Sequence, residues 1–166
     1  MNAEESARAT IRSAVAECDS HIARSRRAWG LLEAFFPLTT EKLKSASEEQ
    51  IGHIDQFVYR FTKLQDAMGA RLFPSLYAWN EERYEPKPFR DVLNRLEQLE
   101  ILPSVRRWQF FRDLRNVLAH DYPETIDQTV MTLNTLHREW QQMEQLYTQV
   151  REYCRTKRLI DDGDNS

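Results

Sequence analysis

The sequence predicts an all-α protein, an antiparallel bundle of about five helices, on three observations. Apolar residues recur at spacings of three and four along nearly the whole chain, which is the period of one helical face. No stretch alternates convincingly between apolar and polar residues, so no strand is expected. The 166 residues include only 4 glycines and 6 prolines, and most of the prolines separate one periodic segment from the next.

The first half of the chain predicts two long helical runs. The first run ends before Pro37, and the second starts at Thr40, whose side chain is expected to cap it, and continues as far as Pro74. Because proline lacks an N–H group, we expect a kink or break near Phe73. The apolar stripes of the two runs are Ile11, Val15, Cys18, Ile22, Trp29 and Leu32, and then Ile51, Ile54, Phe57, Val58, Phe61, Leu64, Met68 and Leu72.

The second half predicts a loop and three more helices. Residues 80–88 are charged and contain two prolines, the second of which suits the first turn of a short helix. Ser104 is expected to cap the next helix, and a last long helix follows a break at 121–123. We expect a single domain over residues 1–158 and a short acidic tail over 159–166. The three stripes are Val92, Leu93, Leu96 and Leu99; Val105, Trp108, Phe111, Leu114 and Leu118; and Ile126, Val130, Leu133, Leu136, Trp140, Met143, Leu146 or Tyr147, Val150 and Tyr153.

Glycine content and charge restrict the function. The four glycines are isolated, so the chain contains neither a P-loop nor the GxGxxG of dinucleotide-binding folds. The net charge of −3 argues against a protein that coats nucleic acid. Of the 23 basic residues, however, 18 are arginine, the side chain that binds phosphate through two parallel hydrogen bonds.

The two cysteines fit a reduced, cytoplasmic protein. Cys18 and Cys154 are far apart in the sequence and form no CxxC, so we expect two buried thiols. No apolar run is long enough to span a membrane, and the polar start of the chain does not resemble a signal peptide. His21 lies three residues after Cys18, but two ligands are too few for a metal site, which favours packing in the core.

One window carries a candidate site. Residues 106–123 hold four arginines against two aspartates, and within the window Arg115 and His120 are followed by Tyr122 in the pattern Arg-x4-His-x-Tyr. Five helical positions correspond to about 140° of rotation and ~7.5 Å of rise, so a long guanidinium can meet the imidazole across one groove. Tyr122 precedes Pro123, which pushes it into an extended conformation beyond the helix end.

Histidine and arginine together have the chemistry needed to cleave RNA without a metal. His120 can take a proton near neutral pH, and Arg115 can stabilise the negative charge that develops on phosphorus. A structural interpretation stays open. In that interpretation His120 interacts with the helix dipole, Arg115 pairs on the surface with Asp113 or Asp121, and Tyr122 packs in the bundle.

The same residues resemble a HEPN domain, specifically the HepT-like toxins. Those proteins carry Arg-x4-6-His at a helix end, a polar residue directly after the arginine, here Asn116, and the extension His-x-Tyr. The segment Phe57 to Gly69 is similar to the second-helix region of many of them. The helix order agrees over most of the chain, but only residues 115–122 are specific.

The resemblance implies a metal-independent endoribonuclease toxin of a type VII-like toxin–antitoxin pair. It would act on RNA as a homodimer whose two motifs face a shared cleft, with Arg115 and His120 in the catalytic roles and no cofactor. Tyr122 matches the tyrosine that a cognate minimal nucleotidyltransferase antitoxin modifies with AMP. No glycine here precedes a serine, so the chain lacks the Gly-Ser step of that enzyme and is expected to be its substrate.

Two neighbouring residues are expected to support the site, and two other functions stay open. Asn116 orients Arg115, contacts the phosphate or is simply solvated, and Arg112 either extends the phosphate contact or is a solvated arginine. The alternatives are a non-catalytic HEPN binding or scaffold subunit of a nucleotidyltransferase complex, and a plain helical interaction module whose Arg/His pair caps a helix.

Other candidate residues are expected to be structural. Asp55 and Asp66 are too far apart for paired acid/base chemistry, which favours a solvated or dimer-contacting face. The pair His53 and Asp55 fails as a metal site because it also supplies too few ligands. Among the four tryptophans, Trp108 is the one considered for stacking on a base.

Overall fold

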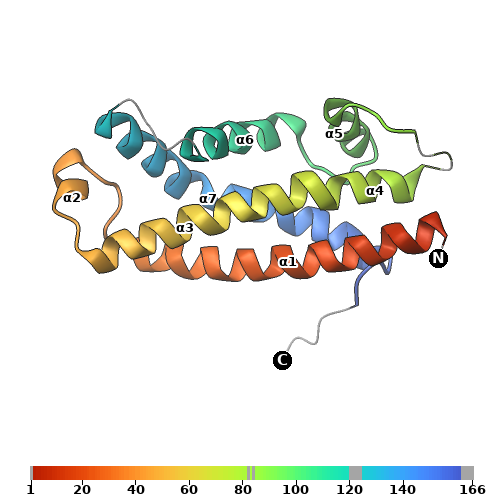
Figure 1. Ribbon diagram of the computed structural model, residues 1–166, viewed down its shortest axis with the longest axis horizontal. Coiled ribbons are helices and arrows are strands. Elements are labelled where there is room, and N and C mark those ends of the chain that lie inside the picture. The colour runs from red at the N-terminus through yellow and green to blue at the C-terminus, as the bar shows by residue number, and fades with distance from the viewer. Residues whose placement is uncertain (1, 82, 84, 120–124, 162–166) are drawn as a thin grey trace.

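A computed structural model describes residues 2–81, 83, 85–119 and 125–161 of the chain. Within these residues the protein is all-α, and the prediction of an antiparallel bundle is confirmed. Helix α1 (Ala3–Leu32) lies alongside a continuous helical run made of α3 (Glu48–Ala67), the π-helical segment η1 (Met68–Leu72) and α4 (Phe73–Asn80). Figure 1 shows this pair in front, with α6 (Val105–Ala119) above α3 and α7 (Ile126–Thr156) crossing behind the pair, where it contacts α1. The short helices α2 (Thr40–Lys44) and α5 (Phe89–Gln98) lie at opposite ends.

Side-chain caps determine where several helices begin. Asn2 and Glu5 form a capping box at the start of α1, and Thr39 rather than Thr40 caps α2. The predicted second run is interrupted between α2 and α3, because Ser47 and Gln50 form another capping box that starts a new helix. Thr125 caps α7 by accepting a hydrogen bond from the backbone N–H of Gln128.

The predicted break near Phe73 is wrong, because a π-helical turn accommodates the proline. Pro74 lies in the first turn of α4, and the N–H of Phe73 donates to the carbonyl of Met68, five residues earlier. The wider turn makes room for a residue that has no N–H group to donate, so the helix continues to Asn80. Figure 1 shows the run from α3 to α4 as one long ribbon.

Large aromatic side chains fill the core between α3, α6 and α7. Phe61 packs edge-to-face against Phe111 and Trp140, and Trp108 packs edge-to-face against Phe73. Trp108 is fully buried, so the suggestion that it stacks on a base is wrong. Its spacing along α6 places it on the apolar stripe, and aromatic rings gain most of their stabilising energy from such burial.

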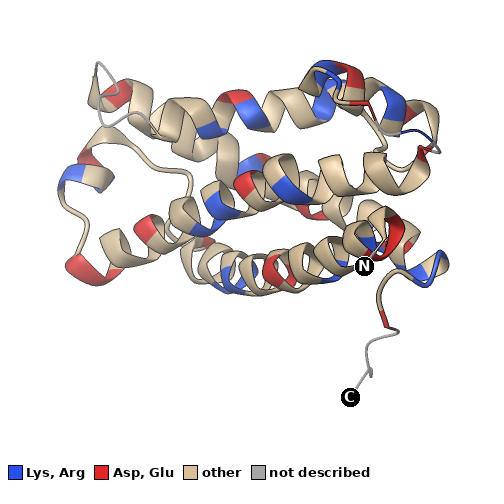
Figure 2. Cartoon of the chain, turned by 45° about the vertical axis from the view of Figure 1, so that its right-hand side comes forward, with Lys and Arg blue, Asp and Glu red and all other residues tan. Residues whose placement is uncertain are grey.

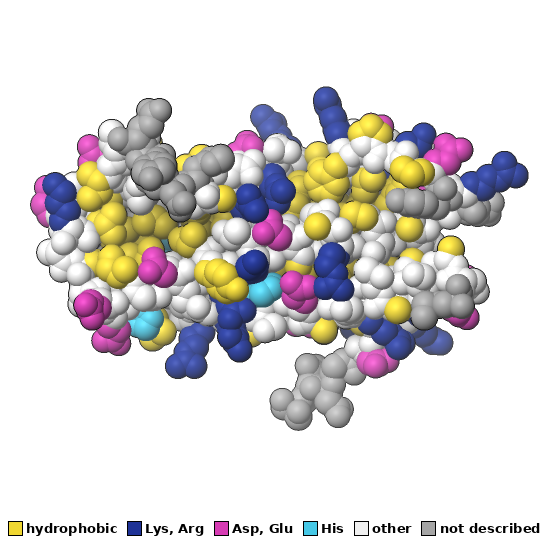
Figure 3. Space-filling model, in the orientation of Figure 1, with side chains coloured by type: hydrophobic (Ala, Val, Ile, Leu, Met, Phe, Trp, Pro, Cys, Tyr) yellow, Lys and Arg dark blue, Asp and Glu magenta, His cyan; other side chains and the backbone are white. Residues whose placement is uncertain are grey.

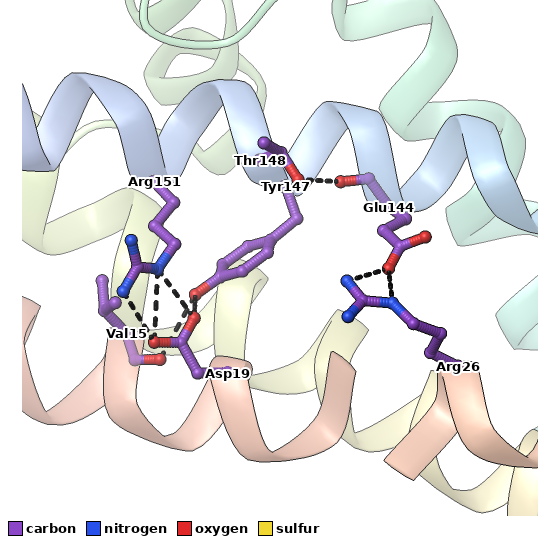
Figure 4. A network of polar contacts seen from close by, with 7 residues as sticks. All are labelled: Val15, Asp19, Arg26, Glu144, Tyr147, Thr148 and Arg151. Carbon is purple, nitrogen blue, oxygen red and sulfur yellow. Dashed lines mark hydrogen bonds and ion pairs between the residues drawn. The ribbon is translucent and has the colours of Figure 1, made fainter. Parts of the chain in front are cut away.

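A partly buried polar network joins α1 to α7. The hydroxyl of Tyr147 donates to Asp19 (2.6 Å), and Arg151 donates to the same carboxylate at 3.0 and 3.2 Å (Figure 4). Burial and the Asp19 contact raise the pKa of Tyr147, so its phenol keeps the proton that it donates. Arg26 and Glu144 form an ion pair farther along the same two helices. The network therefore fixes the register of α7 on α1.

The end of the bundle extends past the predicted domain boundary at residue 158. Leu159 and Ile160 are buried, and Arg12 on α1 donates to the carbonyl of Leu159. Cys18 and Cys154 are both free and buried, as expected, and burial raises the pKa of each thiol to about 12. No helix in the described part of the chain combines the length and apolar character of a membrane span.

Candidate functional site

The candidate site begins with the way the sequence orients α6. Ser104 accepts a hydrogen bond from the backbone N–H of Arg107 at the start of this helix. Trp108 and Phe111 are its buried residues and face the core. Arg112 and Arg115 are three residues apart and therefore share one side of the helix, where both reach toward α3.

The two arginines converge on one carboxylate, that of Asp66 in the last turn of α3. Nη2 of Arg115 donates to Oδ1 of Asp66 at 2.8 Å, and Nη1 of Arg112 lies 3.6 Å from the same oxygen. Figure 2 shows basic positions of α6 across from acidic and basic positions of α3. The side chains are partly exposed, with 23% of Arg115, 33% of Arg112 and 38% of Asp66 accessible, so the cluster is open to solvent and to a ligand.

The cluster keeps one positive charge and unused hydrogen-bond donors. Two guanidinium groups share one carboxylate, which leaves a local charge of +1. Nε of Arg115 and Nη1 of Arg112 form no hydrogen bond among the described residues, and both atoms are shielded from solvent. The exposed parts of the two guanidinium groups are what an oxyanion such as a phosphate can reach.

The close approach of η1 to α6 brings Asp66 near the two arginines of the cluster. A β-carbon on Gly69 would lie 3.4 Å from Cζ2 of Trp108 and 3.9 Å from Nη1 of Arg112. Because Gly69 has no side chain, the π-helical segment lies close to the arginine-bearing side of α6. The Asp66 carboxylate, three residues earlier, then lies within reach of both arginines.

The structure describes only some of the residues that the sequence predicts for this site. Arg115 pairs with Asp66 and not with Asp113, which instead accepts a hydrogen bond from Gln109. Asn116 is exposed and makes no hydrogen bond to Arg115, so in the described part of the chain Asp66 is the residue that orients this arginine. The two other predicted residues of the motif, His120 and Tyr122, lie outside the described residues.

Asp66 is a functional candidate that the spacing of residues along α3 does not reveal. The sequence predicts a solvated or dimer-contacting face for both Asp55 and Asp66. Asp55 is indeed exposed, but Asp66 is held by two arginines of another helix. The available signal was the position of Asp66 in the segment 57–69, which resembles the HepT-like second helix.

A second polar cluster lies on α1 and α3 beside the first. His21 is buried, with Nδ1 3.2 Å from Nη1 of Arg60 and Nε2 3.5 Å from Oε1 of Glu17. Burial lowers the pKa of His21, so Nδ1 can accept a hydrogen bond from the guanidinium. Glu17 also pairs with Arg71 of η1. No group of three His, Cys, Asp or Glu side chains able to hold a metal ion occurs in the part that the structure describes.

Comparisons with family models, with curated proteins and with solved structures found no match for this chain. The resemblance to HepT-like toxins therefore depends on the residues of the motif and on the segment 57–69. Its functional implications are treated below as a proposal.

Proposed function

We propose that the chain is an endoribonuclease toxin of a type VII-like pair, with Arg115 and His120 as its catalytic residues. The observation that carries the proposal is the convergence of Arg112 and Arg115 on Asp66, which leaves one excess positive charge and two partly exposed guanidinium groups on the helix that precedes His120 in the sequence. A site of this kind suits the phosphodiester of RNA, and the motif supplies the proton-transfer group that an anion-binding site alone lacks.

The proposed reaction is an internal transesterification. His120 takes the proton from a ribose 2′-hydroxyl, and the 2′-oxygen attacks the adjacent phosphorus. Arg115 stabilises the charge on the pentacoordinate phosphorus, and Arg112 adds a second cation beside it. The 5′-oxygen leaves with a proton, so the products are a 2′,3′-cyclic phosphate and a 5′-hydroxyl. His120 of one protomer and His120 of a second would divide the roles of base and acid in a homodimer.

Tyr122 is proposed as the site of control by a cognate nucleotidyltransferase. Transfer of AMP from ATP to the phenol releases pyrophosphate and adds a negative phosphodiester two residues after His120. Such a charge opposes the binding of RNA to neighbouring arginines. Intact mass of the wild type and of Tyr122→Phe, each produced with that enzyme, tests this role, because the adduct should be absent from the variant.

Expression in a bacterial host tests the toxic activity. The wild type should arrest growth, whereas Arg115→Ala and His120→Ala should not. Arg107→Ala is the matched control, because Arg107 lies on α6 but contacts Gln142 of α7 instead of Asp66. If wild type and His120→Ala affect growth equally, the proposed toxin activity is wrong.

The Arg115–Asp66 ion pair also favours a second candidate, a non-catalytic scaffold or binding subunit of a nucleotidyltransferase complex. In that case Arg115 serves mainly to hold α6 against α3. The two proposed functions differ in whether they require His120. A scaffold should bind the nucleotidyltransferase equally well as wild type and as His120→Ala, and neither form should cleave RNA.

A further inference from the structure

A surface patch on α3, made of Tyr59, Arg60 and Lys63, has a composition suited to nucleic acid. The Tyr59 side chain is 50% exposed. The Cζ atom of Arg60 lies 5.2 Å from the centre of its ring, and Nζ of Lys63 lies 5.6 Å from it. We refer to these three residues as the Tyr59 patch. It presents an aromatic ring and two cations at the same place on the surface.

The two cations of the Tyr59 patch are not neutralised by carboxylates. Within the described residues, Arg60 makes its hydrogen bond with Nδ1 of His21, an imidazole, which supplies no negative charge to offset the guanidinium. Lys63 contacts the Tyr59 ring and forms no ion pair with any described carboxylate. Unpaired cations of this kind attract polyanions.

The Tyr59 patch adjoins the proposed site. Tyr59, Lys63 and Asp66 are spaced by four and three residues, so they share one face of α3. At 1.5 Å of rise per residue, Lys63 lies about 4.5 Å and Tyr59 about 10.5 Å along the helix from Asp66. Asp66 is in turn bound to Arg115. The patch therefore lies within about 10.5 Å, measured along α3, of the carboxylate that binds Arg115.

The charge of the surface around the Tyr59 patch and the Asp66 cluster favours a polyanionic ligand. Figure 3 shows basic and acidic side chains gathered midway along this face, around a histidine. The charged residues of the Tyr59 patch, of the Asp66 cluster and of the cluster around His21 carry five positive and two negative charges, a net of +3 on a chain whose total is −3. These residues are Arg60, Lys63, Arg71, Arg112 and Arg115, with Glu17 and Asp66.

We propose that the Tyr59 patch binds single-stranded RNA beside the Arg115 site, with a base stacked on Tyr59 and phosphates held by Lys63 and Arg60. The inference rests on the proposed function and adds that the RNA substrate is single-stranded. A base can reach an exposed ring only when it is not stacked in a duplex. An acidic protein segment would use the two cations but would leave the aromatic ring without a role.

Binding of a labelled single-stranded RNA with 2′-O-methyl groups to the full chain tests the inference, because this RNA lacks the attacking hydroxyl and stays intact. Tyr59→Ala should weaken binding roughly tenfold, the usual range for loss of one stacked base. Tyr59→Phe keeps the ring and should bind within about twofold of the wild type. Phe110→Ala is the matched control, since Phe110 is an exposed aromatic residue of α6 outside the patch.

The salt dependence of the same binding tests Lys63. Lys63→Ala should reduce the slope of log K against log salt by about 0.7, the value for one phosphate contact on a single strand. Lys157→Ala is the matched control, because Lys157 also lies over a tyrosine ring, that of Tyr153, but at the C-terminal end of α7. Its slope should equal that of the wild type.

Several outcomes would overturn the inference. Equal RNA affinity for Tyr59→Ala and Phe110→Ala refutes it, and so does the absence of RNA binding by the wild type. It is also wrong if Tyr59→Ala loses only an acidic protein partner and keeps its affinity for RNA. Failure of the proposed nuclease is a separate result. If RNA binds through Tyr59 but is not cleaved, the proposed nuclease activity is wrong. If RNA is cleaved equally well without Tyr59, the proposed role of the Tyr59 patch is wrong.

Discussion

Asp66 of α3 and Arg115 of α6 form an ion pair at 2.8 Å, and this contact joins the helix that carries the motif to the helix beside it. The same Asp66 oxygen also lies 3.6 Å from Arg112. Two guanidinium groups one turn apart on one helix repel each other, and a shared carboxylate offsets that repulsion. Asp66 therefore acts as a positioning residue for both arginines.

Replacement of Asp66 should reduce RNA cleavage more than it reduces stability. Asp66→Ala frees Arg115 from its fixed orientation, so we expect kcat to fall at least tenfold, with partial rescue in Asp66→Glu. The loss of unfolding free energy should not exceed about 1 kcal/mol, because both partners of the pair are partly exposed. Single-turnover kinetics and urea unfolding measure the two quantities.

Asp55→Asn is the control for that experiment, because Asp55 lies on the same helix, is exposed and forms no ion pair with another described residue. It should match the wild type in both measurements. Full activity of Asp66→Ala would show that Arg115 does not depend on Asp66.

Stability should decrease as the pH falls below about 6.5. Burial is the main cause that lowers the pKa of His21 and of His137 in the folded protein. The unfolded chain therefore binds protons at a higher pH than the folded chain does, and the neutral rings contribute their full stability only above the unfolded pKa, near 6.5. Urea unfolding at pH 5 and pH 7.5 measures the difference.

Variants of the two histidines test the cause of this pH dependence. The double substitution His21→Gln with His137→Gln should flatten the fall in stability between pH 7.5 and pH 5. His53→Gln is the matched control on the surface of α3, and with it the fall should persist. An unchanged slope in the double variant would assign the acid sensitivity to other groups.

The Tyr147–Asp19 hydrogen bond should stabilise the contact between α1 and α7. Tyr147→Phe removes the donor, while Asp19 keeps its three hydrogen bonds with Arg151, so we expect a loss of about 1 kcal/mol of unfolding free energy. Asp19→Ala should cost more, because it removes the main acceptor of the buried phenol and the ion pair with Arg151. Thermal unfolding compares the two variants, and equal stability of Asp19→Ala and wild type would contradict the expected role.

Helical periodicity predicted most of the fold because each buried stripe recurs along a single helix. Most of the predicted stripes of α1 and α7 are buried, whereas Trp29 and Tyr153 are partly buried and Ile126, at the start of α7, is exposed. The break before α3 was missed, since the capping box of Ser47 and Gln50 falls within a run whose spacing is compatible with one helix. The continuation past Pro74 was missed because a π-helical turn depends on hydrogen bonding that the spacing does not reveal.

The candidate site was only partly predictable for a different reason. A motif within one helix can be read from spacing, and this approach identified Arg112 and Arg115. The partner of both arginines is Asp66, which is 46 and 49 residues away in the sequence, and the pairing depends on how α3 packs against α6. Trp108 lies on the predicted stripe of α6 and is buried there against Phe73 of a third element, and this burial rules out only the alternative of base stacking.

The most direct test of the central claim is the chemistry of RNA ends after incubation with the purified chain in EDTA. The account predicts fragments that end in 2′,3′-cyclic phosphate and begin with a 5′-hydroxyl, produced by the wild type and by Arg107→Ala but not by Arg115→Ala or His120→Ala. Intact RNA with the wild type, or the same fragments with His120→Ala, would contradict it.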